Sequence, residues 1–151
     1  MKQAGRVPWW GLVAGAVLLA FLGLAFFAAP SASSAANDFM RALKAGDVDK
    51  LVDLSYVPSE DIPKIRKQWE FCLHVATPYY NFAWRPSYSR EISDTEFVVR
   101  MKVIKNSEKP TSYDEDFDIP LIKSGGKWKV DVYRLSDKFY PALPREGLDV
   151  G

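Results

Sequence analysis

The sequence predicts an α+β protein: an N-terminal transmembrane helix, then helices packed on a curved antiparallel sheet in a cone-shaped fold. Three observations lead to this expectation. Residues 9–29 contain no charged side chain. Apolar residues then recur at helical spacing as far as residue 76, and afterwards at every second position, as in strands. The strand patterns follow one another across short turns, and strands joined so closely run antiparallel.

The N-terminal apolar segment is long enough to cross a membrane. About 21 residues rising ~1.5 Å each give a helix of about 31 Å, which matches a hydrocarbon core of ~30 Å. Lys2 and Arg6 precede the segment, so residues 1–8 are expected in the cytoplasm and the domain on the extracytoplasmic side, periplasmic or extracellular. A cleaved signal peptide is the alternative, but its apolar core usually has only about 7–15 residues. We expect a retained single-pass anchor.

Two features connect this segment to possible neighbours. Gly11 and Gly15 form a GxxxG pair through which two membrane helices can approach closely, although glycine is common in such helices for other reasons. Residues 30–36, PSASSAA, are expected to be a short linker. The domain of residues 37–135 should therefore lie close to the bilayer, with a C-terminal arm at 136–151.

Three helices are expected at the start of the domain. The stretch ANDFMRALKAGDVDKLVDLSY, residues 36–56, predicts two short amphipathic helices separated by Gly46, with Asp47 capping the second. A longer helix is expected from Ser59 to Thr77, where Pro78 ends it. Its expected apolar face consists of Ile62, Ile65, Trp69, Cys72, Leu73 and Ala76.

Four strands are expected after Pro78, separated by turns at 93–94 and 106–110 and by a tight hairpin of the primed type at Gly125 and Gly126. Arg85 and Pro86 interrupt the first strand, which predicts a bend or bulge near the sheet edge. The alternating apolar residues are Tyr80, Phe82 and Trp84; then Phe97, Val99, Met101 and Val103; then Tyr113, Phe117, Ile119 and Leu121; and finally Trp128, Val130 and Val132.

The order of a helix, the KAGDVDKLVDL elbow, a longer helix and a sheet ending in IPLIKSGGKWKVDVYRL resembles the nuclear transport factor two-like superfamily. The resemblance covers residues 34–135 and implies the cone-shaped fold of polyketide cyclases and ketosteroid isomerases. It implies little about activity, because that superfamily includes isomerases, cyclases, dehydratases and many non-enzymatic adaptors. Its membrane-tethered members include periplasmic core components of type IV secretion systems.

Composition and motifs exclude several classes of function. After the apolar segment the chain has 18 of its 20 basic residues and all 19 acidic ones. These charges nearly balance, so no basic surface for nucleic acid is expected. His74 and Cys72 are the only residues of their types, which excludes zinc-finger spacing and an intramolecular disulfide. We expect His74 on the surface and Cys72 in the core. The chain has no H-E-x-x-H, P-loop, G-x-G-x-x-G or G-x-S-x-G pattern, so no cofactor or metal is expected, and a non-enzymatic protein is favoured.

The acidic run YDEDFDIP places Asp114, Asp116 and Asp118 on one strand face. Folding the preceding hairpin about residues 107–109 puts Lys102 opposite Asp114 and Arg100 opposite Asp116, so cross-strand ion pairs explain the run. A calcium site or a site for a basic partner is the alternative, although calcium usually takes its ligands from a curled loop.

Glu115 is expected on the opposite, apolar face, where a charge needs a partner or a wet pocket. The simpler interpretation is an ion pair with Arg134 at the mouth of the cone. In the isomerase-like relatives a carboxylate base and a hydrogen-bond donor act inside the cone, and Glu115 with Tyr113 or Tyr80 is the nearest counterpart by chemistry. Candidate contacts for a small apolar ligand are therefore Glu115, Arg134, Tyr113, Tyr80 and Trp84.

The arm contains Phe139, Tyr140 and Leu143, interrupted by Pro141 and Pro144, so it cannot form a regular helix. It either packs on its own sheet or docks on another protein. Two hypotheses follow: a non-enzymatic module that assembles with other membrane proteins or with itself, or a binding or isomerase/cyclase-like domain for a small apolar ligand.

Overall fold

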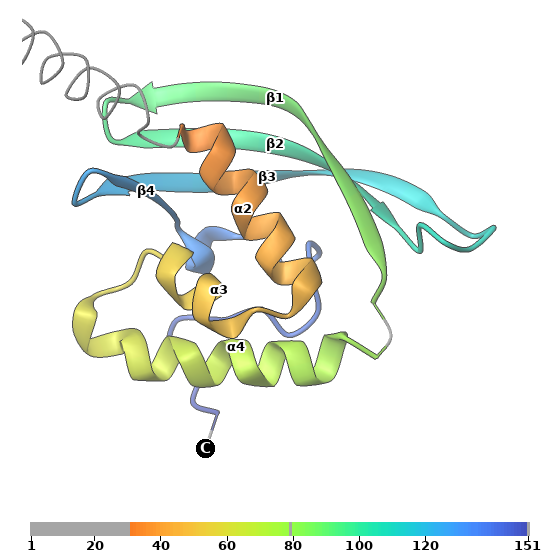
Figure 1. Ribbon diagram of the computed structural model, residues 1–151, viewed down its shortest axis with the longest axis horizontal. Helices are drawn as coiled ribbons and strands as arrows, with labels where there is room; N and C mark the ends of the chain where they lie inside the picture. Colours follow the sequence, from red (N-terminus) through yellow and green to blue (C-terminus); the bar gives the residue numbers. More distant parts are fainter. Residues whose placement is uncertain (1–30, 79, 151) are drawn as a thin grey trace, which may run out of the picture.

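The computed structural model describes residues 31–78 and 80–150 and confirms the α+β fold, with helices packed on a four-stranded antiparallel sheet (Figure 1). The predicted membrane segment at residues 9–29, with Gly11 and Gly15, lies outside the described residues. Within the described ranges, no helix is both long and apolar enough to span a bilayer. The elements are α2 (Ala32–Ala45), α3 (Val48–Leu54), η1 (Ser59–Asp61), α4 (Ile62–Ala76), β1 (Phe82–Ser93), β2 (Glu96–Lys105), β3 (Tyr113–Ser124), β4 (Lys127–Val130) and η2 (Val132–Arg134).

Helix α2 begins earlier than the sequence analysis expects. Ser31 caps it by accepting a hydrogen bond from the Ser34 amide at 3.1 Å, and alanine is the strongest helix former. Residues 32–36, which we assign to a linker from the sequence, therefore form the first turn of α2, and Ala32, Ala35 and Ala36 are buried. At the other end Gly46 has a left-handed φ of 69°, which ends the helix where expected.

Helix α4 ends before Pro78 as predicted, but its buried face differs slightly from the expected one. Gln68 is fully buried, whereas Ile62 in the first turn is 44% exposed. The Gln68 amide donates to the carbonyl oxygens of Arg145 and Leu148 at 2.9 and 2.6 Å. The C-terminal segment, residues 136–150, therefore covers a face of α4 that the helical pattern alone assigns to solvent.

The sheet has the order β1-β2-β3-β4, and all neighbouring strands run antiparallel. Strand β1 lies at an edge, and its pairing with β2 shifts between Pro86 and Tyr88, which confirms the predicted irregularity. Gly125 and Gly126 have φ values of 57° and 76° and form the predicted tight hairpin.

Strand β4 is shorter than the fourth strand expected from the sequence. It ends at Val130, and the next amide, that of Asp131, donates to the carbonyl oxygen of Pro120 at 2.9 Å. The chain then turns into η2. Val132 is buried but belongs to η2, and Arg134 does not continue the sheet pattern.

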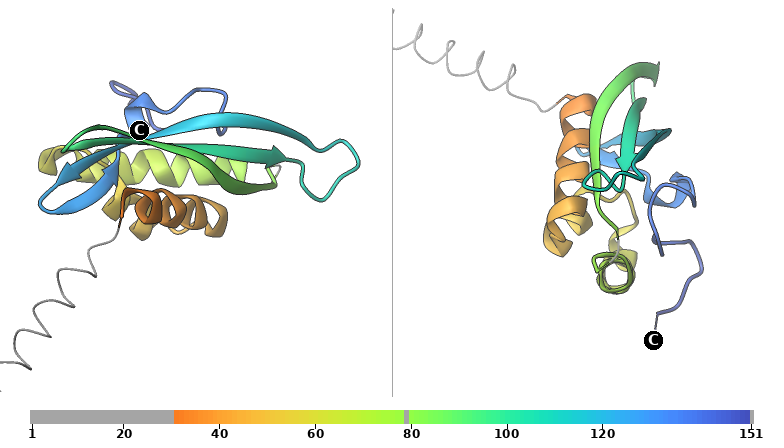
Figure 2. Two further views of the ribbon diagram at one scale, coloured as in Figure 1. Left: turned by 90° about the horizontal axis from the view of Figure 1, so that it is seen from above. Right: turned by 90° about the vertical axis from the view of Figure 1, so that its right-hand side faces the viewer.

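The core lies between the sheet, the helices and the C-terminal segment. Helix α2 contacts all four strands, and its Phe39 packs edge-on against Trp69 of α4, with ring centroids 5.9 Å apart. Helix α2 and the C-terminal segment both pack on the inward face of the sheet, which carries Trp84 and Phe117: Trp84 hydrogen bonds to Asn37 of α2, and Phe117 packs on Phe139. Figure 2 shows α2 and the segment at opposite margins of the domain, with α4 below. Buried side chains from α2, α3, α4 and all four strands form one cluster with Leu135, Phe139, Tyr140 and Leu143.

Candidate functional site

The partner of Glu115 is Lys105. The Lys105 Nζ lies 2.6 Å from a Glu115 carboxylate oxygen and also donates to the carbonyl oxygen of Lys138 at 2.8 Å. The same ammonium lies 4.9 Å from the centre of the Phe117 ring. The predicted ion pair between Glu115 and Arg134 is wrong. Because β4 ends at Val130, Arg134 lies exposed in η2 with its guanidinium 3.8 Å from Asp131.

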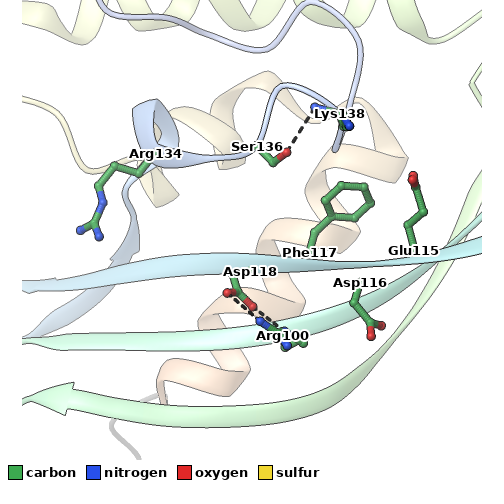
Figure 3. Close-up of a pocket in the computed structure, with 8 residues that line it drawn as sticks. All are labelled: Arg100, Glu115, Asp116, Phe117, Asp118, Arg134, Ser136 and Lys138. Carbon is green, nitrogen blue, oxygen red and sulfur yellow. Dashed lines mark hydrogen bonds and ion pairs between the residues drawn. The ribbon is translucent and has the colours of Figure 1, made fainter.

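Glu115 and Arg134 nevertheless line the same groove, which runs beside β3 and has a volume of about 580 Å³. Figure 3 shows Glu115 and Phe117 pointing from β3 toward the C-terminal segment, with Arg134 directed away from them. The groove is open to solvent. Its lining is mostly charged and consists of Arg100, Glu115, Asp116, Phe117, Asp118, Arg134, Ser136 and Lys138.

The three aromatic candidates for ligand binding make different contacts. The Tyr80 hydroxyl donates to the Phe139 carbonyl oxygen at 2.8 Å, and burial raises the pKa of Tyr80. Tyr113 is 52% exposed at the start of β3. The Trp84 indole donates to Asn37 of α2 at 3.2 Å. Of the five predicted contacts, Glu115 and Arg134 line the groove beside β3, whereas Tyr80 lines a separate pocket at the end of α4.

The C-terminal segment fills the interior of the domain. Phe139, Tyr140 and Leu143 are 1%, 4% and 3% exposed. Phe139 packs edge-on against Phe117 with centroids 5.5 Å apart, and Tyr140 packs against Tyr80 at 4.8 Å. Of the two alternatives left open by the sequence, the structure shows the arm packed on its own domain. These three side chains are therefore buried within the domain and not exposed for a partner.

A second, smaller pocket of about 250 Å³ lies at the end of α4, lined by residues that include Lys44, Thr77, Tyr80 and Tyr140. Lys44 donates from its Nζ to the Phe82 carbonyl oxygen at 2.9 Å. Burial raises the pKa of Tyr140 to about 12, so its hydroxyl stays protonated at neutral pH. These groups are held by the fold and are not arranged around a reactive position.

The acidic run forms cross-strand ion pairs as expected, and the predicted pair of Lys102 with Asp114 is found, but Arg100 pairs with Asp118 and not with the predicted Asp116. Arg100 makes two hydrogen bonds to Asp118, at 2.7 and 3.0 Å, and Lys102 lies 3.1 Å from Asp114 and 3.4 Å from Asp116. The register places Lys102 opposite Asp116 and Arg100 opposite Asp118, because the turn is centred one residue later than expected. Hydrogen bonds from these cations lower the pKa of Asp114 and Asp118. Over the ranges that the structure describes, no three His, Cys, Asp or Glu side chains are grouped to hold a metal ion.

Cys72 and His74 lie where the sequence analysis expects them. The Cys72 thiol is buried and donates to the Pro141 carbonyl oxygen at 3.3 Å. Burial raises its pKa to about 12, so it lacks the thiolate character of a nucleophile. His74 is exposed on α4.

Two features of this region were missed from the sequence. Lys105 follows Val99, Met101 and Val103 at the period of two, so the pattern contains a signal for its inward position. The second feature is the edge of β3, which β4 pairs only from Leu121 to Ser124. The length of β4 sets that free edge, and nothing in the alternation of β3 indicates it.

Comparison with known proteins shows similarity of fold only. No family model and no curated protein matches the chain. Similar solved structures include a SEC-C motif containing protein from Rhodopseudomonas palustris, with a TM-score of 0.49 and 13% identity over 65% of this chain and 73% of that one. A putative calcium/calmodulin-dependent protein kinase type II association domain from Thiobacillus denitrificans has a TM-score of 0.51 and 9% identity over 68% and 90% of the chains. A protein of unknown function from Mycobacterium tuberculosis has a TM-score of 0.48 and 13% identity over 69% and 68%. Of the three, the Thiobacillus domain supports the α+β architecture, and an identity of 9% says nothing about activity.

Proposed function

We propose that this chain is a single-pass membrane protein whose non-enzymatic extracytoplasmic domain acts as an assembly or accessory subunit of a membrane protein complex. We also propose that the domain is a member of the nuclear transport factor two-like superfamily. The observation that carries the functional proposal is the filled interior: Phe139, Tyr140 and Leu143 occupy the space between sheet and helices in which a ligand would have to bind.

The membrane part of the proposal rests on the sequence. Residues 9–29 are uncharged and follow Lys2 and Arg6, the arrangement expected for a span with its N-terminus in the cytoplasm. Helix α2 begins at Ala32, so only two residues separate it from the end of the apolar segment. A domain held so closely meets other membrane proteins at short range. Gly11 and Gly15 are the proposed contact between membrane helices.

The small-ligand alternative has less support. Ligand sites are usually concave and mostly apolar, with a few convergent polar groups. The groove beside Glu115 is open and mostly charged, while Tyr80 and Trp84 are engaged in hydrogen bonds elsewhere. The Glu115 carboxylate is paired with Lys105. This arrangement favours a structural role for Glu115.

Crosslinking in intact membranes, followed by purification in mild detergent and mass spectrometry, tests the proposal. We expect the full chain to be recovered with the same neighbouring membrane protein, or with a second copy, in repeated preparations. Recovery as a monomer without a reproducible neighbour would contradict it. A parallel test uses Glu115→Gln: a change in binding or turnover of an apolar ligand with an intact fold would favour the alternative.

A further inference from the structure

The edge of β3 is half unpaired. Strand β2 pairs with β3 from Tyr113 to Ile122, but β4 pairs only with the last four residues of β3. In the part of the chain that the structure describes, no strand pairs with residues 113–119 on the side away from β2. In the left view of Figure 2 this part of β3 lies on the outside of the sheet, beside the C-terminal segment.

Hydrogen bonds elsewhere in β3 show which backbone groups point outward. Pro120 accepts from Asp131 at 2.9 Å, so its carbonyl points to the β4 side, whereas the Lys123 amide donates to Thr95 of the β1–β2 turn at 2.8 Å. In an antiparallel strand the backbone groups of successive residues point to alternate sides. The N–H and C=O groups of Asp114, Asp116 and Asp118 therefore point to the open side. We call these groups the free β3 edge.

The groove of about 580 Å³ lies along this edge. Asp116 and Asp118 line one wall, and Ser136 and Lys138 of the C-terminal segment line the other (Figure 3). Phe117 forms part of the groove between them. An added strand needs a spacing of about 4.8 Å from β3 and presents alternate side chains to the two faces. The groove therefore offers backbone hydrogen bonds together with a place for alternate side chains.

Charge distinguishes between the occupants of this edge. A two-fold pairing of two copies gives antiparallel strands, and centring it on Asp116 would put Asp116 opposite its own copy and Asp114 opposite Asp118. Like charges directly opposite each other destabilise a sheet. Among the described residues, the cations in ion-pair contact with the three carboxylates are Arg100 and Lys102, and both come from β2. On the open side, a Lys or Arg directly opposite one of these carboxylates would instead form a stabilising cross-strand pair. A basic strand is favoured over a second copy.

We propose that the free β3 edge binds an extended segment of a partner protein by antiparallel strand addition, and that the segment carries Lys or Arg at every second position. The basic side chains lie beside Asp114, Asp116 and Asp118, and the alternate residues enter the groove beside Glu115, Ser136 and Lys138. This inference rests on the proposed assembly function and names the surface and the partner chemistry for it.

Synthetic peptides test the edge directly on the full chain in mild detergent. A fluorescent ten-residue peptide alternating lysine with valine is expected to bind, as measured by anisotropy, at least about tenfold more tightly than the glutamate–valine counterpart. In the antiparallel arrangement the lysine amides point to β3. N-methylation of those amides is expected to abolish binding, and N-methylation of the valine amides to preserve it. Absence of binding by the lysine peptide, or equal effects of the two methylations, would overturn the proposal.

Residue-specific hydrogen exchange places the peptide. The amides of Asp114, Asp116 and Asp118 are expected to slow when the lysine peptide is added, whereas the Asp49 amide in α3 is expected to be unchanged. Binding without protection of the three edge amides would overturn the proposal. Concentration-dependent protection of these amides without peptide would also overturn it, because the occupant would then be a second copy.

The variant Asp116→Pro removes one outward N–H, and Pro120 already occupies an equivalent position in the same strand. Asp116→Asn removes the same charge but keeps the N–H. We expect the proline variant to lose peptide binding and the membrane crosslink, and the asparagine variant to retain both in weakened form. If Asp116→Pro is still crosslinked to its neighbour, the edge proposal alone is contradicted. If the wild-type chain is crosslinked to no neighbour, the assembly function itself is contradicted.

Discussion

The Lys105 ammonium and the Glu115 carboxylate lie 2.6 Å apart and join β2 to β3, while the same ammonium holds the Lys138 carbonyl oxygen at 2.8 Å. The side chain of Lys105 is 10% exposed and that of Glu115 is 41% exposed. One largely buried cation therefore connects two strands to the C-terminal segment. This contact places the segment where its aromatic residues fill the interior.

Replacing Lys105 by methionine is expected to destabilise the domain. The variant removes the ion pair with the partly exposed Glu115, which contributes little. It also removes the hydrogen bond from a charged group to the Lys138 carbonyl oxygen, which typically contributes about 1.5–3 kcal/mol. Urea denaturation should show a free energy of unfolding lower by about 2 kcal/mol. Lys138→Ala is the matched control, because its exposed side chain is removed while its carbonyl oxygen remains. Equal stability of the two variants would show that the contact is unimportant.

Phe139→Ala tests the packing of the C-terminal segment. Phe139 is 1% exposed and contacts the Phe117 ring. Truncation of a buried phenylalanine typically costs about 3–5 kcal/mol, so the melting temperature should fall sharply. Asp137→Ala alters an exposed residue of the same segment and should have a much smaller effect. An unchanged melting temperature for Phe139→Ala would mean that the segment does not pack on its own domain in solution.

Ser55→Ala tests a buried hydrogen-bond chain. The Trp69 indole N–H donates to the Ser55 hydroxyl oxygen at 3.0 Å, and that hydroxyl donates to the Leu51 carbonyl oxygen at 2.7 Å. Removing the hydroxyl leaves the buried indole N–H without an acceptor, at a cost of about 1–3 kcal/mol. Calorimetric unfolding measures the loss. Ser87→Ala, at an exposed position, should leave stability nearly unchanged, and an equally mild Ser55→Ala would refute the prediction.

Stability is expected to fall at alkaline pH. Burial raises the pKa of Cys72 from 9.0 and that of Tyr140 from 10.0, each to about 12. The folded state holds these protons more tightly than the unfolded state, so this stabilisation is complete below about pH 9 and is lost as the pH rises toward 12. Urea titrations at pH 8 to 11 measure the slope. Cys72→Ala should flatten the curve between pH 9 and 10, and an unchanged curve would contradict the raised thiol pKa.

The order of elements was predictable from the sequence because the spacing of apolar residues changes clearly, from the helical repeat to every second position. Gly46 and Pro78 mark the ends of helices, and Gly125 and Gly126 mark the last hairpin. The inward position of Lys105 was also within reach, since it continues the pattern of β2. The partner of Glu115 was not predictable, because it depends on where β4 ends. That end is accompanied by the hydrogen bond from the Asp131 amide to the Pro120 carbonyl oxygen, which is a tertiary contact. Packing of the proline-interrupted arm likewise depends on the space left by the other elements. Local preference does not encode that space.

Site-specific photocrosslinking of the full chain in its own membrane tests the assembly function most directly. A photoreactive residue replaces Ser136, which is exposed and lines the groove beside β3, and in a matched variant it replaces Glu60, which is exposed in η1. The account predicts one reproducible adduct with another protein from position 136 and none of the same mass from position 60. Absence of an adduct at both positions, with the fold intact, would contradict it.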